Sequence, residues 1–91
     1  MAHNKEDAIG TARKDLARRL GVSDAEIQEE SVENSDFPDM ALGAATSGEM
    51  SGQMITPGWR IRLQAKNQSF EYRANKQQVR LYNYNGKNYR L

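Results

Sequence analysis

The N-terminal part of the chain carries apolar residues at three- and four-residue spacing, which predicts an amphipathic helix over residues 4–20. These positions form a single apolar stripe: Ala8, Ile9, Ala12, Leu16, Ala17 and Leu20. Asn4 is placed to cap the first turn, and Gly21 is placed to end the helix in a left-handed conformation. We therefore expect the stripe to cover one face of a sheet.

The segment after the helix has no sustained apolar period. Ser23 and Glu26 have the spacing of a capping box and predict a single helical turn. Residues 29–34 form a possible strand with Val32 facing inward, and residues 35–52 predict a long loop. The loop contains one proline, three glycines and many small residues: Pro38, Gly43, Gly48 and Gly52 are the turn formers. Loops of this length are more often functional or mobile than neutral.

The C-terminal part alternates apolar and polar residues, which predicts a series of β-strands. The clearest alternation runs from Trp59 to Lys66, where apolar side chains alternate with arginine, glutamine and lysine. We expect strands over residues 53–55, 59–66, 69–74, 79–84 and 87–91.

Short turn signals join these strands. Asn67-Gln68 predicts a two-residue turn, Asn75–Gln78 predicts a longer one, and Asn85-Gly86 is typical of a type I′ hairpin. The segment Thr56-Pro57-Gly58 predicts either a type II turn between two strands or a bulge that bends an edge strand.

These elements predict an α+β fold in which the N-terminal helix packs on one face of a four- to five-stranded antiparallel meander. The 91 residues are enough for one domain with one small core. Within it we distinguish the helix at 4–20, an acidic segment and loop at 24–52, and the meander at 53–91.

The charges of this chain are sorted along the sequence. From Asp24 to Glu49 there are eight acidic residues and no lysine or arginine. From Met50 to Leu91 there are eight basic residues and a single acid, Glu71. The net charge of +1 hides this division. Either the two halves neutralise each other within the fold, or each offers a charged face to a partner.

The predicted turns place three arginines side by side on the face of the sheet away from the helix. Arg62 is expected opposite Arg73, and Arg73 opposite Arg80. A neighbouring row is expected to hold Gln64, Glu71, Tyr82 and Tyr89. Opposed like charges cost up to about 1 kcal/mol per pair, so this face needs anions. Two sources remain open: the acidic segment folding back, or an external anion such as a nucleic acid or an acidic protein.

The middle of the chain carries three short motifs. They read Phe37-Pro38-Asp39-x-x-Leu42-Gly43, then Gln53-x-x-Thr56-Pro57-Gly58-Trp59-x-Ile61-x-Leu63, then Phe70-Glu71-Tyr72. Together they resemble a small bacterial domain of uncharacterised function, over residues 8–74. The resemblance implies a helix-plus-sheet fold and transfers no catalytic residue.

The chain departs from this pattern at its cysteines. Many such relatives look like exported proteins or lipoproteins with a cysteine pair, whereas Ala44 stands at the first of these positions and the sequence has no cysteine. The difference fits a cytoplasmic, cyanobacterial-type branch. Phe37 and Asp39 also have an expected structural role, with Phe37 closing an edge of the core and Asp39 accepting backbone N–H bonds in a turn.

The residue types offer little for catalysis. Nucleophilic catalysis needs a positioned base, and the one histidine, His3, lies at the N-terminus. We find no thiolate ligands for a metal, no EF-hand loop and no phosphate-binding loop motif, so we expect no enzyme activity, no cofactor and no metal. No apolar run approaches the roughly 20 residues of a membrane span, and we expect a cytoplasmic protein.

We therefore expect a small binding or regulatory domain whose partner is a protein. The expected contact residues on the sheet are Arg62, Arg73, Arg80, Tyr82 and Tyr89, and those on the loop are Phe37, Asp39 and Met40. Two alternatives stay open: single-stranded nucleic-acid binding by the basic aromatic sheet face, and binding of a proteinase by the loop.

Overall fold

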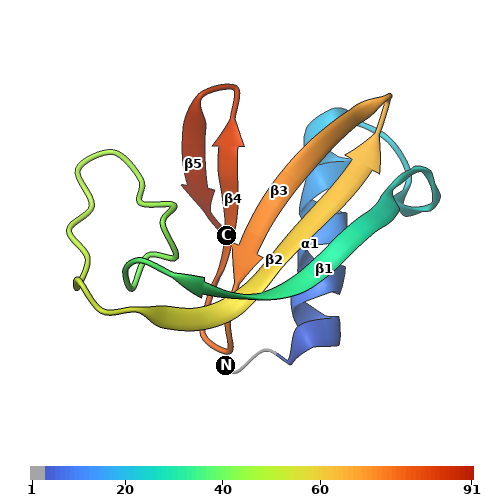
Figure 1. Ribbon diagram of the computed structural model, residues 1–91. Helices are drawn as coiled ribbons and strands as arrows, with labels where there is room; N and C mark the ends of the chain where they lie inside the picture. The colour runs from blue at the N-terminus through green and yellow to red at the C-terminus, as the bar shows by residue number, and fades with distance from the viewer. Residues whose placement is uncertain (1–3) are drawn as a thin grey trace.

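The computed structural model describes residues 4–91 and contains one α-helix, one 3-10 turn and a five-stranded antiparallel sheet (Figure 1). The elements are α1 (Lys5–Leu20), η1 (Asp24–Glu26), β1 (Gln28–Phe37), β2 (Thr56–Ala65), β3 (Gln68–Ala74), β4 (Val79–Tyr84) and β5 (Lys87–Arg90). The strands lie in the sheet in chain order. This arrangement confirms the predicted α+β meander. No helix within residues 4–91 is long and apolar enough to cross a membrane.

The helix α1 begins and ends where its capping residues predict. The Asn4 side chain accepts a hydrogen bond of 2.8 Å from the backbone N–H of Asp7. At the other end Gly21 adopts φ 67°, and its N–H group and that of Val22 both donate to the carbonyl of Ala17. The caps satisfy backbone groups that the helix leaves without partners.

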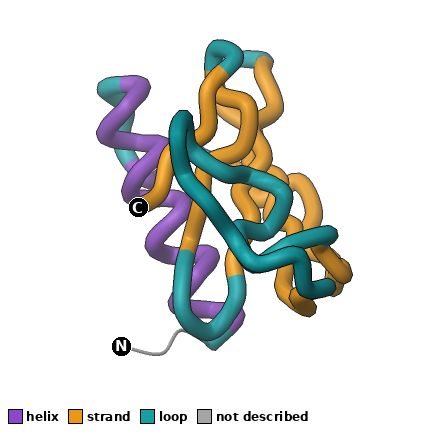
Figure 2. Tube along the Cα trace, turned by 90° about the vertical axis from the view of Figure 1, so that its left-hand side faces the viewer, coloured by secondary structure: helices purple, strands orange, loops and turns teal. Residues whose placement is uncertain are grey.

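Figure 2 shows α1 beside the sheet, and the main core is formed by the side chains that the two bury between them. The helix contributes its apolar stripe, and the sheet contributes every second residue of β2, β3 and β4. The buried apolar residues are Ala8, Ile9, Ala12, Leu16, Ala17, Ile27, Ile61, Leu63, Ala65, Tyr72, Ala74, Val79 and Leu81. Each fully buried leucine or isoleucine contributes roughly 1.5–3 kcal/mol to folding.

Strands β1 and β2 are both longer than the sequence predicts. β2 includes Thr56-Pro57-Gly58, where Pro57 pairs with Asp36 of β1, so the segment is neither a turn nor the end of a separate strand at 53–55. Pairing between β2 and β3 begins only at Trp59. Pro57 therefore has β1 on one side and no strand on the other, and proline is tolerated at such an edge.

The turn between β2 and β3 lies one residue earlier than predicted. It is formed by Lys66 and Asn67, which have φ of 51° and 62° and are both left-handed, as a type I′ hairpin requires. The register consequently moves by two residues, and Arg62 lies opposite Glu71 instead of Arg73. In this register the guanidinium group of Arg62 lies opposite a carboxylate, whereas in the predicted register it lay opposite a second guanidinium group.

A β-bulge in β4 corrects the predicted position of Tyr89. Asn83 has φ 53°, and the β4–β5 register shifts between Leu81 and Tyr84. Tyr89 therefore lies opposite Leu81 instead of Tyr82 and packs against the main core together with Tyr84. Asparagine tolerates the left-handed conformation that the bulge needs.

Candidate functional site

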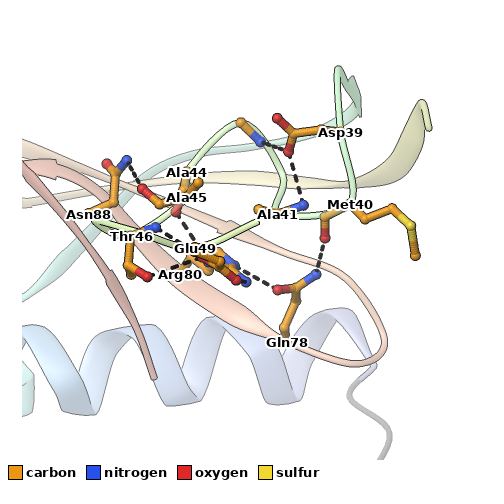
Figure 3. A network of polar contacts seen from close by, with 11 residues as sticks. Asp39, Met40, Ala41, Ala44, Ala45, Thr46, Glu49, Gln78, Arg80 and Asn88 are labelled. Carbon is orange, nitrogen blue, oxygen red and sulfur yellow. Dashed lines mark hydrogen bonds and ion pairs between the residues drawn. The ribbon is translucent and has the colours of Figure 1, made fainter. Parts of the chain in front are cut away.

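Residues 38–55 form a long loop between β1 and β2 that crosses the face of the sheet opposite α1. Figure 3 shows the loop on one side of the strands and the helix on the other. Four apolar side chains of this loop and of the end of β1 are buried outside the main core: Phe37, Ala41, Leu42 and Ala44. Both faces of the sheet are thus covered, one by α1 and the other by the loop.

The centre of this contact is an ion pair between Arg80 of β4 and Glu49 of the loop. The Arg80 side chain is only 2% exposed, and its two terminal nitrogens donate to the two carboxylate oxygens of Glu49 at 2.6 and 2.7 Å. Its Nε donates to Gln78 at 2.6 Å. A bidentate pair of this kind is among the strongest hydrogen-bonding arrangements in proteins.

The electrostatics of Glu49 follow from this geometry. Besides Arg80, the backbone N–H and the hydroxyl of Thr46 donate to its carboxylate, at 2.9 and 3.2 Å. The bonds from Arg80, followed by that from the Thr46 backbone, lower the pKa of Glu49 to about 2. The carboxylate therefore stays ionised at all but strongly acidic pH, and its ion pair with Arg80 is kept.

A second charge cluster surrounds Glu71 of β3. Its carboxylate lies 2.7 Å from Nε of Arg73, 3.3 Å from Nε of Arg60 and 3.6 Å from Nε of Arg62. The Arg73 guanidinium also stacks on Tyr82, with 3.6 Å between the central carbon and the ring centroid. One carboxylate thus stabilises three guanidinium groups.

The predicted arginine row exists, with one member exchanged. The register places Arg60, Arg73 and Arg80 abreast, and Arg62 lies in the next row opposite Glu71. The anions come from Glu49 of the folded-back loop and from Glu71 within the sheet. The sequence signal for Glu71 is its position as the single acid among the basic residues of the C-terminal half.

The sheet holds the loop mainly through the loop's backbone carbonyls. Arg73 donates to the carbonyls of Leu42 and Gly43 at 3.1 and 3.2 Å, and Arg80 to that of Ala44 at 3.3 Å. The bonds from Gln78 to the carbonyl of Met40 and from Asn88 to that of Ala45 measure 2.7 and 2.8 Å (Figure 3). Few loop side chains take part in this anchoring.

The sequence predicts structural roles for Asp39 and Phe37. Asp39 accepts hydrogen bonds from the backbone N–H groups of Ala41 and Gly43 at 2.9 and 3.0 Å, which fixes a turn. Phe37 is buried at the end of β1, within 5.3 Å of the Arg73 guanidinium. The prediction for Asp39 is confirmed, whereas Phe37 is buried outside the main core.

The loop exposes several large apolar side chains. Four large side chains are exposed there: Met40 by 50%, Met50 by 95%, Met54 by 64% and Ile55 by 70%. We call these four residues the methionine surface. Beside it lies a hollow of about 390 Å³, lined by Thr56, Pro57, Gly58, Trp59, Asn75, Lys76 and Gln77.

The structure divides the predicted contact residues into three groups. Arg73, Arg80, Phe37 and Asp39 lie under or within the anchored loop, and a partner would reach the two arginines only if the loop moved away. Tyr82 is half-buried and stacks on Arg73. Arg62 remains accessible at the side of the loop, with its side chain 42% exposed. Met40 points outward, and Tyr89 lies on the helix side.

These features define a small α+β domain with a loop layered on its sheet. Residues 9–82 match a protein family described as a domain of unknown function (DUF8738), and the chain belongs to this family. The matched segment includes the loop and the arginines that hold it. The comparisons with curated proteins and with solved structures gave no match. Within residues 4–91, no three His, Cys, Asp or Glu side chains are grouped so that they could hold a metal ion.

Proposed function

We propose that this domain is a non-enzymatic binding module that contacts a protein partner through the methionine surface. The observation that carries the proposal is the exposure of four large apolar side chains on a loop whose opposite side is fixed by a buried ion pair. Single exposed apolar residues are common on protein surfaces, whereas a contiguous group is typical of an interaction site.

The loop backbone brings Met40 beside the segment that carries the other three residues of the methionine surface. The N–H of Met40 donates to the carbonyl of Gly52 at 2.9 Å, so residue 40 lies beside the segment that joins Met50 to Met54. A Cβ atom at Gly52 would lie 2.6 Å from the Met40 sulfur, which shows how closely this side chain crosses the neighbouring backbone. The sequence neighbour of Met54, Ile55, extends the apolar area toward the hollow at Thr56.

Methionine side chains suit a surface that must adapt to a partner. They are unbranched and polarisable, and their thioethers make favourable contacts with aromatic rings. The neighbouring hollow includes Trp59 and Pro57 and has room for an anchoring side chain of the partner. We therefore expect a partner with an exposed aromatic or aliphatic segment.

The test compares three forms of the domain in affinity capture from the native lysate. The captured protein is then purified, and its affinity for each form is measured. The triple variant Met40→Ser/Met50→Ser/Met54→Ser removes the three methionines, and Lys5→Ser/Glu29→Ser/Lys66→Ser serves as a control with the same number of exposed changes outside the methionine surface and its hollow. We expect the methionine variant to bind the captured protein at least about tenfold more weakly than the wild type does, and the control to bind it with unchanged affinity. Equal binding by both variants would refute the proposed surface.

A protease panel distinguishes the inhibitor-like form of this proposal. If the loop binds a proteinase, the wild-type domain inhibits a serine or cysteine protease and Met40→Asp abolishes the inhibition. If no protease is inhibited while the captured protein still binds through the methionine surface, the partner is of another class.

A further inference from the structure

A second hollow lies on the helix side of the sheet, away from the loop. Its volume is about 570 Å³, and it is lined by Thr11, Lys14, Asp15, Arg18, Arg19, Arg90 and Leu91. The helix α1 supplies one wall and the end of β5 supplies the other. Four lining side chains are cationic and one is acidic, an excess of three positive charges.

The one acid of this hollow is already engaged. Asp15 is 5% exposed and accepts hydrogen bonds from Arg18 and Arg19, both at 2.7 Å, and from the hydroxyl of Tyr72 at 2.8 Å. Burial, followed by the bond to Asp15, raises the pKa of the Tyr72 phenol, so that this group remains a donor. Asp15 thus stabilises two guanidinium groups and has little capacity for the remaining cations.

Arg19 lines the hollow and is held in place by an ion pair and two aromatic rings. Its Nε is bonded to Asp15, and its guanidinium lies 4.4 Å from the ring centroid of Tyr89 and 5.6 Å from that of Tyr84. A planar guanidinium fixed by stacking and an ion pair has already lost its conformational freedom. A ligand that accepts hydrogen bonds from its remaining N–H groups therefore binds without a further loss of conformational entropy in this side chain.

The other two cations are free to meet a ligand. Lys14 and Arg90 are exposed, and in the described part of the chain neither forms an ion pair. The Thr11 hydroxyl adds a neutral donor to the same lining. The hollow therefore combines fixed and mobile positive groups around one space.

We propose that this hollow binds a phosphate-bearing ligand. A terminal phosphate carries a charge of about −1.5 to −2 and three acceptor oxygens. It therefore complements several cations better than a carboxylate, which carries a single negative charge. Guanidinium groups pair with phosphate oxygens through two parallel hydrogen bonds, and lysine adds a point charge. The hollow is also in the size range of small-ligand sites, about 300–1,000 Å³, so a group attached to the phosphate has room.

The experiment uses pyrophosphate as the probe and follows the backbone amide signals of the ¹⁵N-labelled full chain by NMR. We expect saturable shifts confined to residues 11–19 and 88–91. The variant Lys14→Glu/Arg90→Glu reverses two lining charges, and Lys5→Glu/Lys66→Glu makes the same change of net charge at exposed positions outside the hollow. Affinity should fall about tenfold or more in the first variant and stay within about twofold in the second.

Two results would overturn the proposal. One is the absence of saturable shifts at residues 11–19 and 88–91 up to about 10 mM pyrophosphate, a limit well above small-ligand affinities of functional sites. The other is an equal loss of affinity in both charge-reversal variants, which would show general attraction by net charge. If the Lys14→Glu/Arg90→Glu spectrum shows an unfolded chain, Lys14→Gln/Arg90→Gln provides the same comparison.

A nucleoside diphosphate, which carries the same number of phosphate groups as pyrophosphate, is the second probe and identifies the source of the phosphate. Tighter binding than pyrophosphate means that the hollow also holds the sugar or base, whereas equal binding means that it holds the phosphate groups alone. The triple methionine variant should bind pyrophosphate as the wild type does. The failure of either proposal is thereby separable from the failure of the other.

Discussion

The ion pair between Glu49 and Arg80 makes the sharpest prediction for this fold. The change Glu49→Gln keeps the shape of the side chain and removes its charge, so it leaves the Arg80 guanidinium, 2% exposed, without its anion. We expect the loop to lose its hold on the sheet.

The size of the effect follows from the burial of the arginine. Removing one partner of a buried ion pair costs about 3–5 kcal/mol. The glutamine oxygen still accepts one hydrogen bond, which returns about 1 kcal/mol. Glu49 is itself 20% exposed, which lowers the cost further. We therefore expect a loss of about 2–4 kcal/mol in the free energy of unfolding, a large part of the roughly 5–15 kcal/mol of a domain.

Urea unfolding of the purified domain measures this loss, and hydrogen exchange locates it. Amides bonded within the loop, such as those of Ala41, Gly43 and Ala44, should lose protection before the amides of β3 and β4. Arg62→Gln is the control, because this arginine is 42% exposed and its Nε lies 3.6 Å from Glu71. An exposed pair of this kind contributes about 0–1 kcal/mol. A Glu49→Gln loss no larger than that of Arg62→Gln, with unchanged loop protection, would show that the ion pair does not hold the loop on the sheet.

The pKa of Glu49 determines how the stability contributed by its ion pair with Arg80 depends on pH. The native pKa of Glu49, about 2, lies below its ordinary value of 4.5. The pair therefore stabilises the fold above the ordinary pKa, and this contribution is lost as the pH falls from 4.5 through about 2. The stability difference between wild type and Glu49→Gln should shrink over this window by about 1–3 kcal/mol in urea titrations. A difference that is constant from neutral pH to pH 2 would contradict the assignment.

Three further substitutions test other contacts by urea unfolding. Gly58→Ala places a Cβ atom 2.3 Å from the backbone carbonyl oxygen of Ala74, so it should destabilise by about 2 kcal/mol or more; no change would show that the two strands can separate freely there. Gly10→Ala lies in α1 with no atom within 4 Å of the new Cβ and should stabilise by about 0.5–1 kcal/mol, and a loss would contradict the open space. Tyr72→Phe removes a donor to buried Asp15 and should cost about 1–3 kcal/mol, whereas a neutral effect would mean that the two arginines suffice.

The elements with local signals could be predicted from the sequence. Asn4 and Gly21 cap the helix within a few residues of their partners, and Asn85-Gly86 forms its turn with φ of 52° and 83°. Such signals act over one turn of backbone, so composition and spacing are enough to find them. The alternation along β2 also placed the correct residues on the core face, because a register error of two residues leaves the faces unchanged.

The register and the site depend on contacts between distant residues, and the sequence pattern does not contain them. Glu71 gathers Arg60, Arg62 and Arg73 from two strands only when Lys66 and Asn67 form the turn. The bulge that carries Tyr89 to the helix side depends on a single left-handed residue, Asn83. The two-residue shift keeps every side chain on its face, and the bulge changes the face of a tyrosine, which has both an apolar ring and a polar hydroxyl, so no periodic pattern distinguishes these alternatives.

The loop shows the same limit most clearly. Its length and glycines predicted a functional or mobile segment, but its path is decided by Glu49, which meets Arg80 across 31 positions of sequence. The charge division of the chain indicated that some acid would meet the arginines. It did not indicate which one, and the exposed Glu33 and Asp36 of β1 take no part.

The sheet holds the loop by its backbone carbonyls, and this affects which amino-acid substitutions the loop can accept. Met40, Leu42, Gly43, Ala44 and Ala45 are held by their C=O groups, which every amino acid possesses. Outward side chains can therefore be exchanged while the support beneath them keeps its shape, as in the variable loops of other rigid scaffolds. A library randomised at positions 50, 53, 54 and 55, which are all exposed, should therefore keep the fold of this small framework.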